Sequence, residues 1–276
     1  MIDSHTHSKY SKHAIGDIEE VVLSAIENGI KILTITDHAP FPIDENNRLL
    51  EDELQSYFDD ISYVQHKYSK DITILKGLEV DFLPEYLPYI KKLVANIEVD
   101  FLIGSIHFIF LNEKRVNVWD IEVLSNKQLI VQYFSYLKEL IESNLFDSIG
   151  HPDSLLRGGI DDKVYSEYFY SLIPLMKSHN ISYELNASGL RKSTFDIKNK
   201  IKRKGIWNFP SKLLVSVLNQ NNISFTIGSD SHTPNDVSLG IQEVLRVVHQ
   251  LGVKEISYYK NRKNCKIDIN DCINKE

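Results

Sequence analysis

Three histidines stand close together at the start of the chain, in the segment MIDSHTHSKYSKHAIGD. His5 and His7 directly follow a short apolar run, and His13 comes shortly after them. In an extended strand, residues i and i+2 project to the same side, so the imidazoles of His5 and His7 can face one metal ion together. The alternative is a polar N-terminal segment that contains histidines by chance. On local sequence alone, His13 fits either interpretation.

Further histidine and carboxylate side chains recur along the chain, each time where a short apolar run ends. They occur in the segments TDH, GLEVD, GSIH, GHPD, YELN and GSDSH, and they are Asp37, His38, Glu79, Asp81, His107, His151, Asp153, Glu184, Asn186, Asp230 and His232. One pair of histidines could arise by chance, but repeated groups at the same position relative to a strand indicate one shared site. Imidazole and carboxylate ligands without cysteine favour zinc, manganese or iron as divalent ions.

The remaining histidines lie in or near predicted helices. His66, His179 and His249 occupy the segments YVQHKY, MKSHN and VVHQLG. A histidine near a helix C-terminus interacts favourably with the helix dipole, which is a sufficient reason for its presence there. We expect these three side chains to take no part in chemistry.

The strands that would position the metal-type residues are predicted from nearly continuous apolar runs, which are typical of parallel strands covered on both faces. These runs occupy residues 1–4, 31–36, 71–78, 100–106, 146–150, 181–185 and 223–228. Amphipathic helical patterns occupy residues 16–29, 49–70, 86–97, 124–143, 163–179, 211–221 and 236–251. Alternation of strand and helix predicts an α/β fold with a parallel sheet.

This arrangement explains how residues far apart in the sequence could share a site. In a parallel α/β barrel, the carboxyl ends of all strands meet on one face. The length of 276 residues allows one such barrel, and we expect residues 1–276 to form a single domain. The longest irregular stretches, 40–48 and 191–210, are candidates for substrate-binding loops.

The composition is that of an ordinary globular protein. The formal charge of −7, from 31 basic and 38 acidic residues, argues against non-specific nucleic-acid binding. No apolar run approaches the roughly 18 residues that span a bilayer, and no secretory signal is visible. We therefore expect a cytoplasmic protein without a nucleic-acid or membrane partner. Cys265 and Cys272 are expected to be reduced thiols, and no interface signal predicts the oligomeric state.

Taken together, the segments HTH, TDH, GLEVDF, GSIH, GHPD, ELNASGLRK and GSDSH resemble the PHP (polymerase and histidinol phosphatase) family, in unbroken order from Ile2 to about Leu251. The resemblance implies a distorted (β/α)7 barrel that holds three divalent metal ions at the carboxyl ends of its strands. The first ion would be bound by His5, His7, Glu79 and Asp230. The second would share Glu79 as a bridging ligand and add His107 and His151. The third would be bound by His13, His38 and His232.

The same resemblance implies an enzyme. The stand-alone phosphatases of the family hydrolyse L-histidinol phosphate in histidine biosynthesis, so a small phosphate monoester is the expected substrate. The alternative is a nuclease or nucleotide phosphatase with the same metal centre, which would usually show a basic track and stacking aromatic residues. A metal-binding scaffold without activity is a third interpretation, but degenerate copies lose ligands first, and every expected ligand position is filled here.

Phosphate monoesters hydrolyse extremely slowly in water, so the site must provide a nucleophile and neutralise charge on the phosphoryl group. We expect Asp230 to orient the attacking hydroxide as well as to bind a metal. His232, Asp153 or a metal-bound water is expected to protonate the leaving group. Arg157 and Arg191 are the predicted phosphate-binding residues, because a guanidinium group can bind two oxygens at once.

A further set of residues has open roles. Asp37 either fixes a histidine tautomer or caps a helix. Lys192 could also contact phosphate, and Tyr10 and Phe41 could line the pocket. The substrate amine calls for an acidic partner, for which the candidates are Asp44, Glu45, Asp81 and Glu113.

Overall fold

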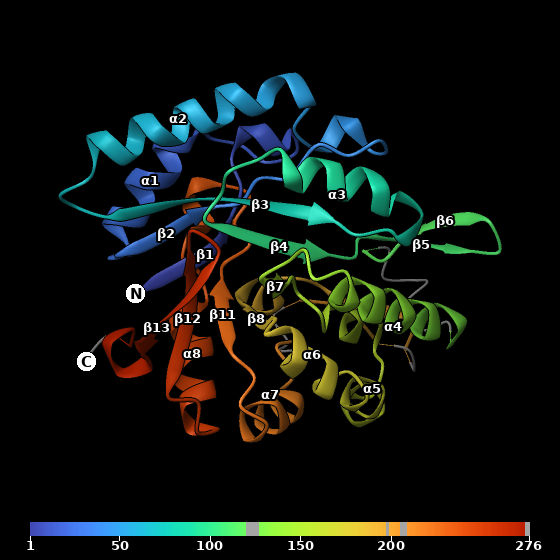
Figure 1. Ribbon diagram of the computed structural model, residues 1–276. Helices are drawn as coiled ribbons and strands as arrows, with labels where there is room; N and C mark the ends of the chain where they lie inside the picture. Colours follow the sequence, from blue (N-terminus) through green and yellow to red (C-terminus); the bar gives the residue numbers. More distant parts are fainter. Residues whose placement is uncertain (120–126, 197–198, 205–208, 274–276) are drawn as a thin grey trace.

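Seven parallel strands form the central sheet of the protein (Figure 1). The computed structural model describes residues 1–119, 127–196, 199–204 and 209–273. The sheet order is β1-β2-β3-β4-β7-β8-β11, formed by β1 (Ile2–Thr6), β2 (Ile32–Ile35), β3 (Thr73–Asp81), β4 (Phe101–Ser105), β7 (Ser148–Ile149), β8 (Ser182–Asn186) and β11 (Phe225–Gly228). Each predicted apolar run overlaps one of these strands, so the predicted parallel α/β architecture is confirmed.

The sheet closes into a barrel between its first and last strands. The closure consists of an isolated parallel bridge between Thr6 and Ser231 and of two backbone hydrogen bonds beside it. His7 N–H donates to the carbonyl of Ser231 at 2.9 Å, and Asp230 N–H donates to the carbonyl of His5 at 2.8 Å. A bridge in place of a full ladder makes the barrel distorted, as the predicted (β/α)7 fold requires.

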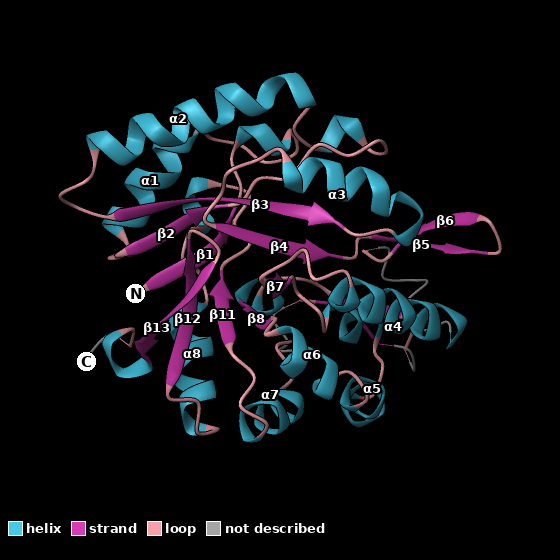
Figure 2. Ribbon diagram, in the orientation of Figure 1, coloured by secondary structure: helices cyan, strands magenta, loops and turns pink. Residues whose placement is uncertain are grey.

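Helices pack on the outside of this barrel (Figure 2). They are α1 (Ile18–Glu27), α2 (Leu54–Lys67), α3 (Leu87–Ala95), α4 (Lys127–Glu142), α5 (Asp162–Tyr170), α6 (Ile173–His179), α7 (Lys212–Gln220) and α8 (Ile241–Gln250). Each long helix turns an apolar stripe inward, as α8 does with Val244, Leu245 and Val248, all fully or almost fully buried. None of the helices in the described ranges is long and apolar enough to cross a membrane.

Two helix predictions differ from the structure for local reasons. The stretch 163–179 forms two helices, α5 and α6, and Pro174 stands in the first turn of α6, where its missing N–H is tolerated. The stretch 236–251 is helical only from Ile241, because Gly240 before it has a φ of 87°. Of the predicted helix 124–143, residues 124–126 lie outside the described part of the chain.

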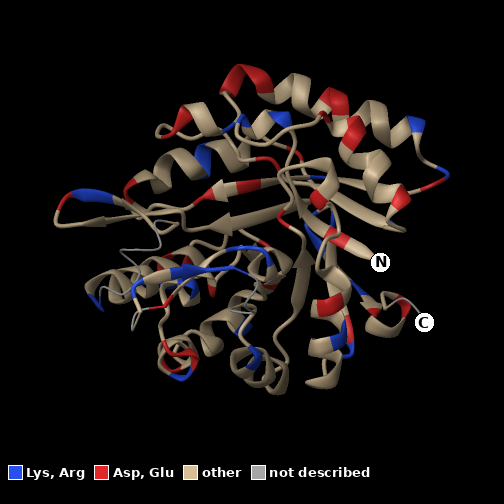
Figure 3. Ribbon diagram, turned by 180° about the vertical axis from the view of Figure 1, so that it is seen from behind, with Lys and Arg blue, Asp and Glu red and all other residues tan. Residues whose placement is uncertain are grey.

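Three antiparallel hairpins were not predicted. They are β5 (Phe108–Leu111) with β6 (Lys114–Asn117), β9 (Thr194–Asp196) with β10 (Ile201–Arg203), and β12 (Glu255–Lys260) with β13 (Lys263–Asp268). The β9–β10 hairpin corrects the expectation that 191–210 is irregular throughout. The β5–β6 hairpin projects from the barrel, with basic residues near its tip (Figure 3).

Candidate metal centre

A cleft of about 420 Å³ opens at the carboxyl ends of the strands, and most of the predicted site residues line it. The lining consists of His13, His38, Asp44, Asn47, Arg48, Glu79, His107, Phe108, Asn117, Trp119, His151, Arg157, Lys192, Asp230 and His232. His5 and His7 are fully buried and contact several of these side chains. The fold therefore brings all the predicted metal ligands together, although they come from both ends of the chain.

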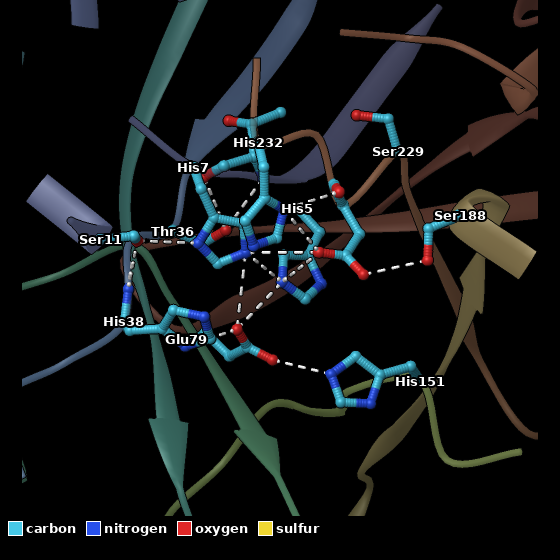
Figure 4. Close-up of polar contacts among 12 residues, drawn as sticks. His5, His7, Ser11, Thr36, His38, Glu79, His151, Ser188, Ser229 and His232 are labelled. Carbon is cyan, nitrogen blue, oxygen red and sulfur yellow. Dashed lines mark hydrogen bonds and ion pairs between the residues drawn. The ribbon is translucent and has the colours of Figure 1, made fainter. Parts of the chain in front are cut away.

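The first predicted ligand group gathers around one oxygen of Glu79 (Figure 4). His5 Nε2 lies 3.3 Å and His7 Nε2 lies 3.5 Å from Glu79 Oε2. The same two nitrogens are 4.0 and 3.5 Å from Asp230 Oδ1. All four side chains are buried, and their ligand atoms converge on one small volume, as a shared cation requires.

The second group gathers around the other oxygen of the same carboxylate. His151 Nε2 is 2.9 Å and His107 Nε2 is 3.4 Å from Glu79 Oε1. Glu79 thus presents one oxygen to each group, which is the arrangement of a bridging carboxylate. Glu79 comes from the end of β3, which lies beside β4 in the sheet.

The third group is less separate than predicted. His13 Nε2 and His232 Nε2 are 2.9 Å apart, and the His13 and His38 rings have centroids 5.2 Å apart. However, His38 Nδ1 also lies 3.0 Å from Glu79 Oε2. His38 consequently stands where the groups meet, within reach of more than one ion position.

Carboxylates fix the orientation of two of these imidazoles. His5 Nδ1 lies 2.6 Å from Glu184 Oε1, and His107 Nδ1 contacts Asp81 Oδ1. A carboxylate oxygen only accepts, so each Nδ1 carries the hydrogen and donates it. The Nε2 atoms of His5 and His107 are thereby directed into the cleft.

Backbone carbonyls orient two more imidazoles in the same way. His13 Nδ1 lies 2.8 Å from the carbonyl oxygen of Ser11, and His232 Nδ1 lies 3.1 Å from that of Asp230. Burial lowers the pKa of His232 to about 4. A neutral ring with a lone pair on Nε2 suits a metal ligand. The role of His232 as a donor of the leaving-group proton stays a prediction.

The nitrogen atoms that point inward approach one another closely. Three Nε2 pairs are formed, by His5 with His7 at 3.0 Å, His107 with His151 at 3.2 Å and His13 with His232 at 2.9 Å. Two such nitrogens repel unless a proton or metal ion lies between or beside them. Although burial opposes it, the charges of Asp81 and Glu79 raise the pKa of His107 to about 10. The carboxylates thus favour positive charge in the cluster, and borderline divalent metals suit a mixed set of imidazole and carboxylate ligands.

Asp37 acts on this cluster through an intermediate serine. It accepts hydrogen bonds from the backbone and hydroxyl groups of both Ser8 and Ser11. The Ser11 hydroxyl donates to Asp37 Oδ1 at 2.7 Å, and it lies 3.0 Å from His7 Nδ1. Of the two roles left open for Asp37, the structure supports tautomer control, and the imidazole concerned is His7 and not the adjacent His38.

Asp81 is engaged inside the protein and cannot receive the substrate amine. Its carboxylate binds His107 Nδ1 and also pairs with Arg48 Nη1 at 2.6 Å. Burial alone would raise the pKa of Asp81, but the positive charges of Arg48 and His107 hold the pKa well below its ordinary value. Asp44 lines the cleft and is 28% exposed, with Arg48 Nη2 3.6 Å from its Oδ2 and Asn47 Nδ2 donating to its Oδ1 at 2.8 Å. Glu45 and Glu113 are not among the lining residues.

Of the two arginines predicted to bind phosphate, the structure places Arg157 in the cleft lining but not Arg191. Arg157 lines the cleft as predicted, and its guanidinium carbon lies 4.8 Å from the centre of the Trp119 ring. Arg191 instead donates to the backbone carbonyls of Ser229 at 2.8 Å and Leu239 at 2.9 Å. Lys192 takes its place in the lining, with Nζ also 4.8 Å from the Trp119 ring.

Asp153 is also placed differently from the expectation. It is fully buried, its Oδ2 accepts the Ser211 N–H at 2.6 Å, and it is not among the residues that line the cleft. Burial raises its pKa to about 7. The side chain connects the loop after β7 to Ser211, the N-cap residue of α7. Its role as a proton donor stays a prediction.

Several remaining residues lie outside the cleft lining. Tyr10 donates a hydrogen bond to Asp60, and Phe41 packs against Tyr86. The outer helices α2, α6 and α8 carry the histidines His66, His179 and His249.

A parallel β/α barrel with histidines and carboxylates gathered at its strand ends defines a metal-binding barrel protein of the hydrolase type. The family model of the PHP domain matches residues 3–188, which is more than half of the chain, and the protein belongs to this family.

Relatives with this architecture span nearly the whole chain. A probable histidinol-phosphatase of Deinococcus radiodurans is 27% identical over 271 residues, covering 95% of this chain and 98% of the relative. The histidinol-phosphatase of Lactococcus lactis is 24% identical, covering 96% and 98%. The crystal structure of the histidinol phosphate phosphatase of Lactococcus lactis, complexed with zinc, L-histidinol and phosphate, superposes with a TM-score of 0.79 at 19% identity, covering 96% and 98%. This likeness establishes the fold.

Proposed function

We propose that this protein is a metal-dependent phosphomonoesterase that hydrolyses L-histidinol phosphate to L-histidinol and phosphate in histidine biosynthesis. The observation that carries the proposal is one cleft in which a buried cluster of histidines and carboxylates faces two cationic side chains, Arg157 and Lys192. The relatives named above supply the substrate, since a neighbour with the same fold binds zinc, L-histidinol and phosphate. The cleft volume of about 420 Å³ also suits a small ester better than a nucleic-acid strand.

The metal centre would hold three divalent ions, with zinc, manganese and iron all compatible with the ligands. The residues that would bind them are His5, His7, His13, His38, Glu79, His107, His151, Asp230 and His232. Such ions, when bound, lower the pKa of water and neutralise charge on the phosphoryl oxygens.

The protein's own side chains hold the reacting groups in place. Ser188 donates a hydrogen bond to Asp230 Oδ2 at 3.0 Å, which leaves Oδ1 directed at the histidine cluster. Arg157 and Lys192 would bind the phosphate oxygens, and their shared contact with Trp119 restricts both cations to the same side of the cleft. Asp44 would bind the ammonium group of the substrate at the cleft mouth.

A steady-state screen of phosphorylated metabolites tests this function. Protein loaded with zinc or manganese is expected to release phosphate from L-histidinol phosphate with a kcat/KM at least about 100-fold above that for nucleoside monophosphates, or about 2.7 kcal/mol. Dialysis against a strong chelator is expected to remove this activity, and added metal is expected to restore it. A preference for nucleotides would contradict the proposed substrate.

Removal of the Arg157 guanidinium tests the phosphate-binding assignment. A charged hydrogen bond contributes about 1.5–3 kcal/mol, so Arg157→Ala is expected to raise KM by roughly 10- to 100-fold. The matched control is Arg203→Ala, which removes an exposed guanidinium on the β10 strand that pairs with Asp196. An unchanged KM in Arg157→Ala, measured alongside that control, would assign Arg157 to loop structure alone.

A further inference from the structure

One buried carboxylate contacts ligand residues of two different groups. Glu184 lies on β8 and is 1% exposed. Its Oε1 accepts a hydrogen bond from His5 Nδ1 at 2.6 Å, and its Oε2 accepts one from the backbone N–H of His151 at 2.5 Å. His5 belongs to the first predicted ligand group and His151 to the second. The two oxygens of Glu184 therefore connect the first and second ligand groups.

The position of Glu184 distinguishes it from a metal ligand. Its Oε1 binds the Nδ1 side of the His5 ring, while the Nε2 side faces His7 and Glu79. Its Oε2 accepts a second hydrogen bond, from Asn186 Nδ2 at 3.1 Å. Both oxygens are thus engaged by protein donors on the far side of the imidazole.

The contact with His151 holds an unusual backbone conformation. His151 has a φ of 28°, in the left-handed region that residues with a side chain rarely adopt. Such conformations persist where surrounding contacts impose them, and they gather at functional sites. The Glu184 hydrogen bond fixes the peptide nitrogen of His151, and from this backbone its ring reaches Glu79 at 2.9 Å.

The neighbouring strand leaves room for this pair. A Cβ atom added to Gly228 on β11 would lie 2.3 Å from His5 Cβ and 2.9 Å from Glu184 Oε1. Glycine at this position is therefore required by the close approach of His5 and Glu184, and it explains the first residue of the GSDSH segment.

We propose that Glu184 is a positioning residue that orients ligands of two metal sites. One oxygen fixes the His5 tautomer with Nε2 free to bind a metal, and the other fixes the backbone from which His151 reaches the second site. This inference rests on the metal centre proposed above, and it concerns metal affinity, which can be measured without any substrate.

Glu184→Gln is the decisive variant, because it keeps the size of the side chain and removes one acceptor. The amide nitrogen must face either His5 Nδ1–H or the His151 N–H, both of which donate. Because one of the two contacts is lost, we expect at least one of the zinc equivalents bound by each chain to weaken by roughly 10- to 100-fold, the usual effect of losing a group that orients a metal-binding histidine. Competition with a chromophoric chelator measures each equivalent.

Two matched variants separate this effect from general disruption. Ser188→Ala removes the hydroxyl that contacts one ligand, Asp230, and is expected to weaken one equivalent. Glu255→Gln removes an exposed carboxylate paired with Lys266, and is expected to leave zinc binding unchanged. Equal zinc titrations for Glu184→Gln and wild type would overturn the inference, whereas a wild type that binds no zinc would overturn the metal centre itself.

A measurement on the unaltered protein covers the case in which Glu184→Gln does not fold. Long-range ¹H–¹⁵N spectra of the zinc-loaded wild type, with labelled histidine, report which ring nitrogen carries hydrogen. The inference requires a protonated Nδ1 and a metal-bound Nε2 at His5. A His5 ring with the opposite tautomer would refute the proposed role of Glu184 without reference to activity.

Discussion

Replacement of Glu79 by glutamine is expected to abolish phosphatase activity, with a fall in kcat/KM of at least about 10⁴-fold, or about 5 kcal/mol. No other carboxylate in the described cluster pairs with so many imidazoles. Its two oxygens approach ring nitrogens of His5, His7, His38, His107 and His151. An amide nitrogen in place of either oxygen would remove one shared anionic ligand and direct a donor at the imidazoles.

The effect should appear in metal content as well as in rate. Elemental analysis of purified Glu79→Gln is expected to show fewer zinc ions per chain than wild type. Glu243→Gln, which changes an exposed residue on α8, is the control for loss of one carboxylate. Activity above about one tenth of wild type in Glu79→Gln would contradict the role of Glu79 as the common ligand.

Replacement of Arg48 by methionine is expected to destabilise the protein by about 3–5 kcal/mol, the usual effect of removing one partner from a buried ion pair. The Arg48 side chain is 3% exposed and pairs with the 1% exposed Asp81 at 2.6 Å. Its Nε also donates to the carbonyl oxygen of Asp44 at 3.1 Å, which fastens the loop at the cleft mouth. Urea unfolding of wild type and variant measures the loss, and Tm is expected to fall by about 10 °C.

The pH dependence of this loss has a defined sign. The folded-state pKa of Asp81 is depressed by Arg48 and His107, so the pair stabilises the protein above the ordinary pKa of an aspartate. The contribution disappears as the pH falls through the lower folded-state pKa. The stability difference between Arg48→Met and wild type should therefore be largest at neutral pH and shrink under acid conditions. Arg262→Met breaks a pair with Asp147 in which the arginine side chain is 33% exposed. It should show a smaller loss, because solvent screens this partly exposed cation.

The barrel could be predicted because its strands are buried on both faces and leave an uninterrupted apolar signal. Residues 31–36 and 223–228 are examples, and each contains one strand of the seven-stranded sheet. The clustering of the predicted ligands could be predicted because most of them lie at the end of such a strand or directly after it, whereas His13 lies in the loop after β1. Their binding of metal stays a prediction. Two hairpin strands gave no comparable signal, since β6 reads KRVN and β10 reads IKR, and both are largely exposed. Strands that bury little apolar area leave little periodicity in the sequence.

The finer assignments depended on side-chain directions that sequence cannot specify. Arg191 and Lys192 are adjacent, and the backbone turn after β8 sends the first toward carbonyl groups and the second into the cleft. Asp81 follows the same strand as Glu79, yet its partner is Arg48, which comes from a distant loop. The position of Glu184 near a strand end was predictable from the sequence. Its role was not, because it depends on the contact of its carboxylate with Nδ1 of His5.

The closure of the barrel has a consequence for folding. The hydrogen bonds that join β1 to β11 are made by the backbone of His5, His7, Asp230 and Ser231. Three of these residues also offer side chains to the first predicted ion. Cations bound there would connect the first and last strands of the sheet. Loading the protein with zinc should therefore raise its melting temperature and slow the exchange of the amide hydrogens at this junction with solvent deuterium.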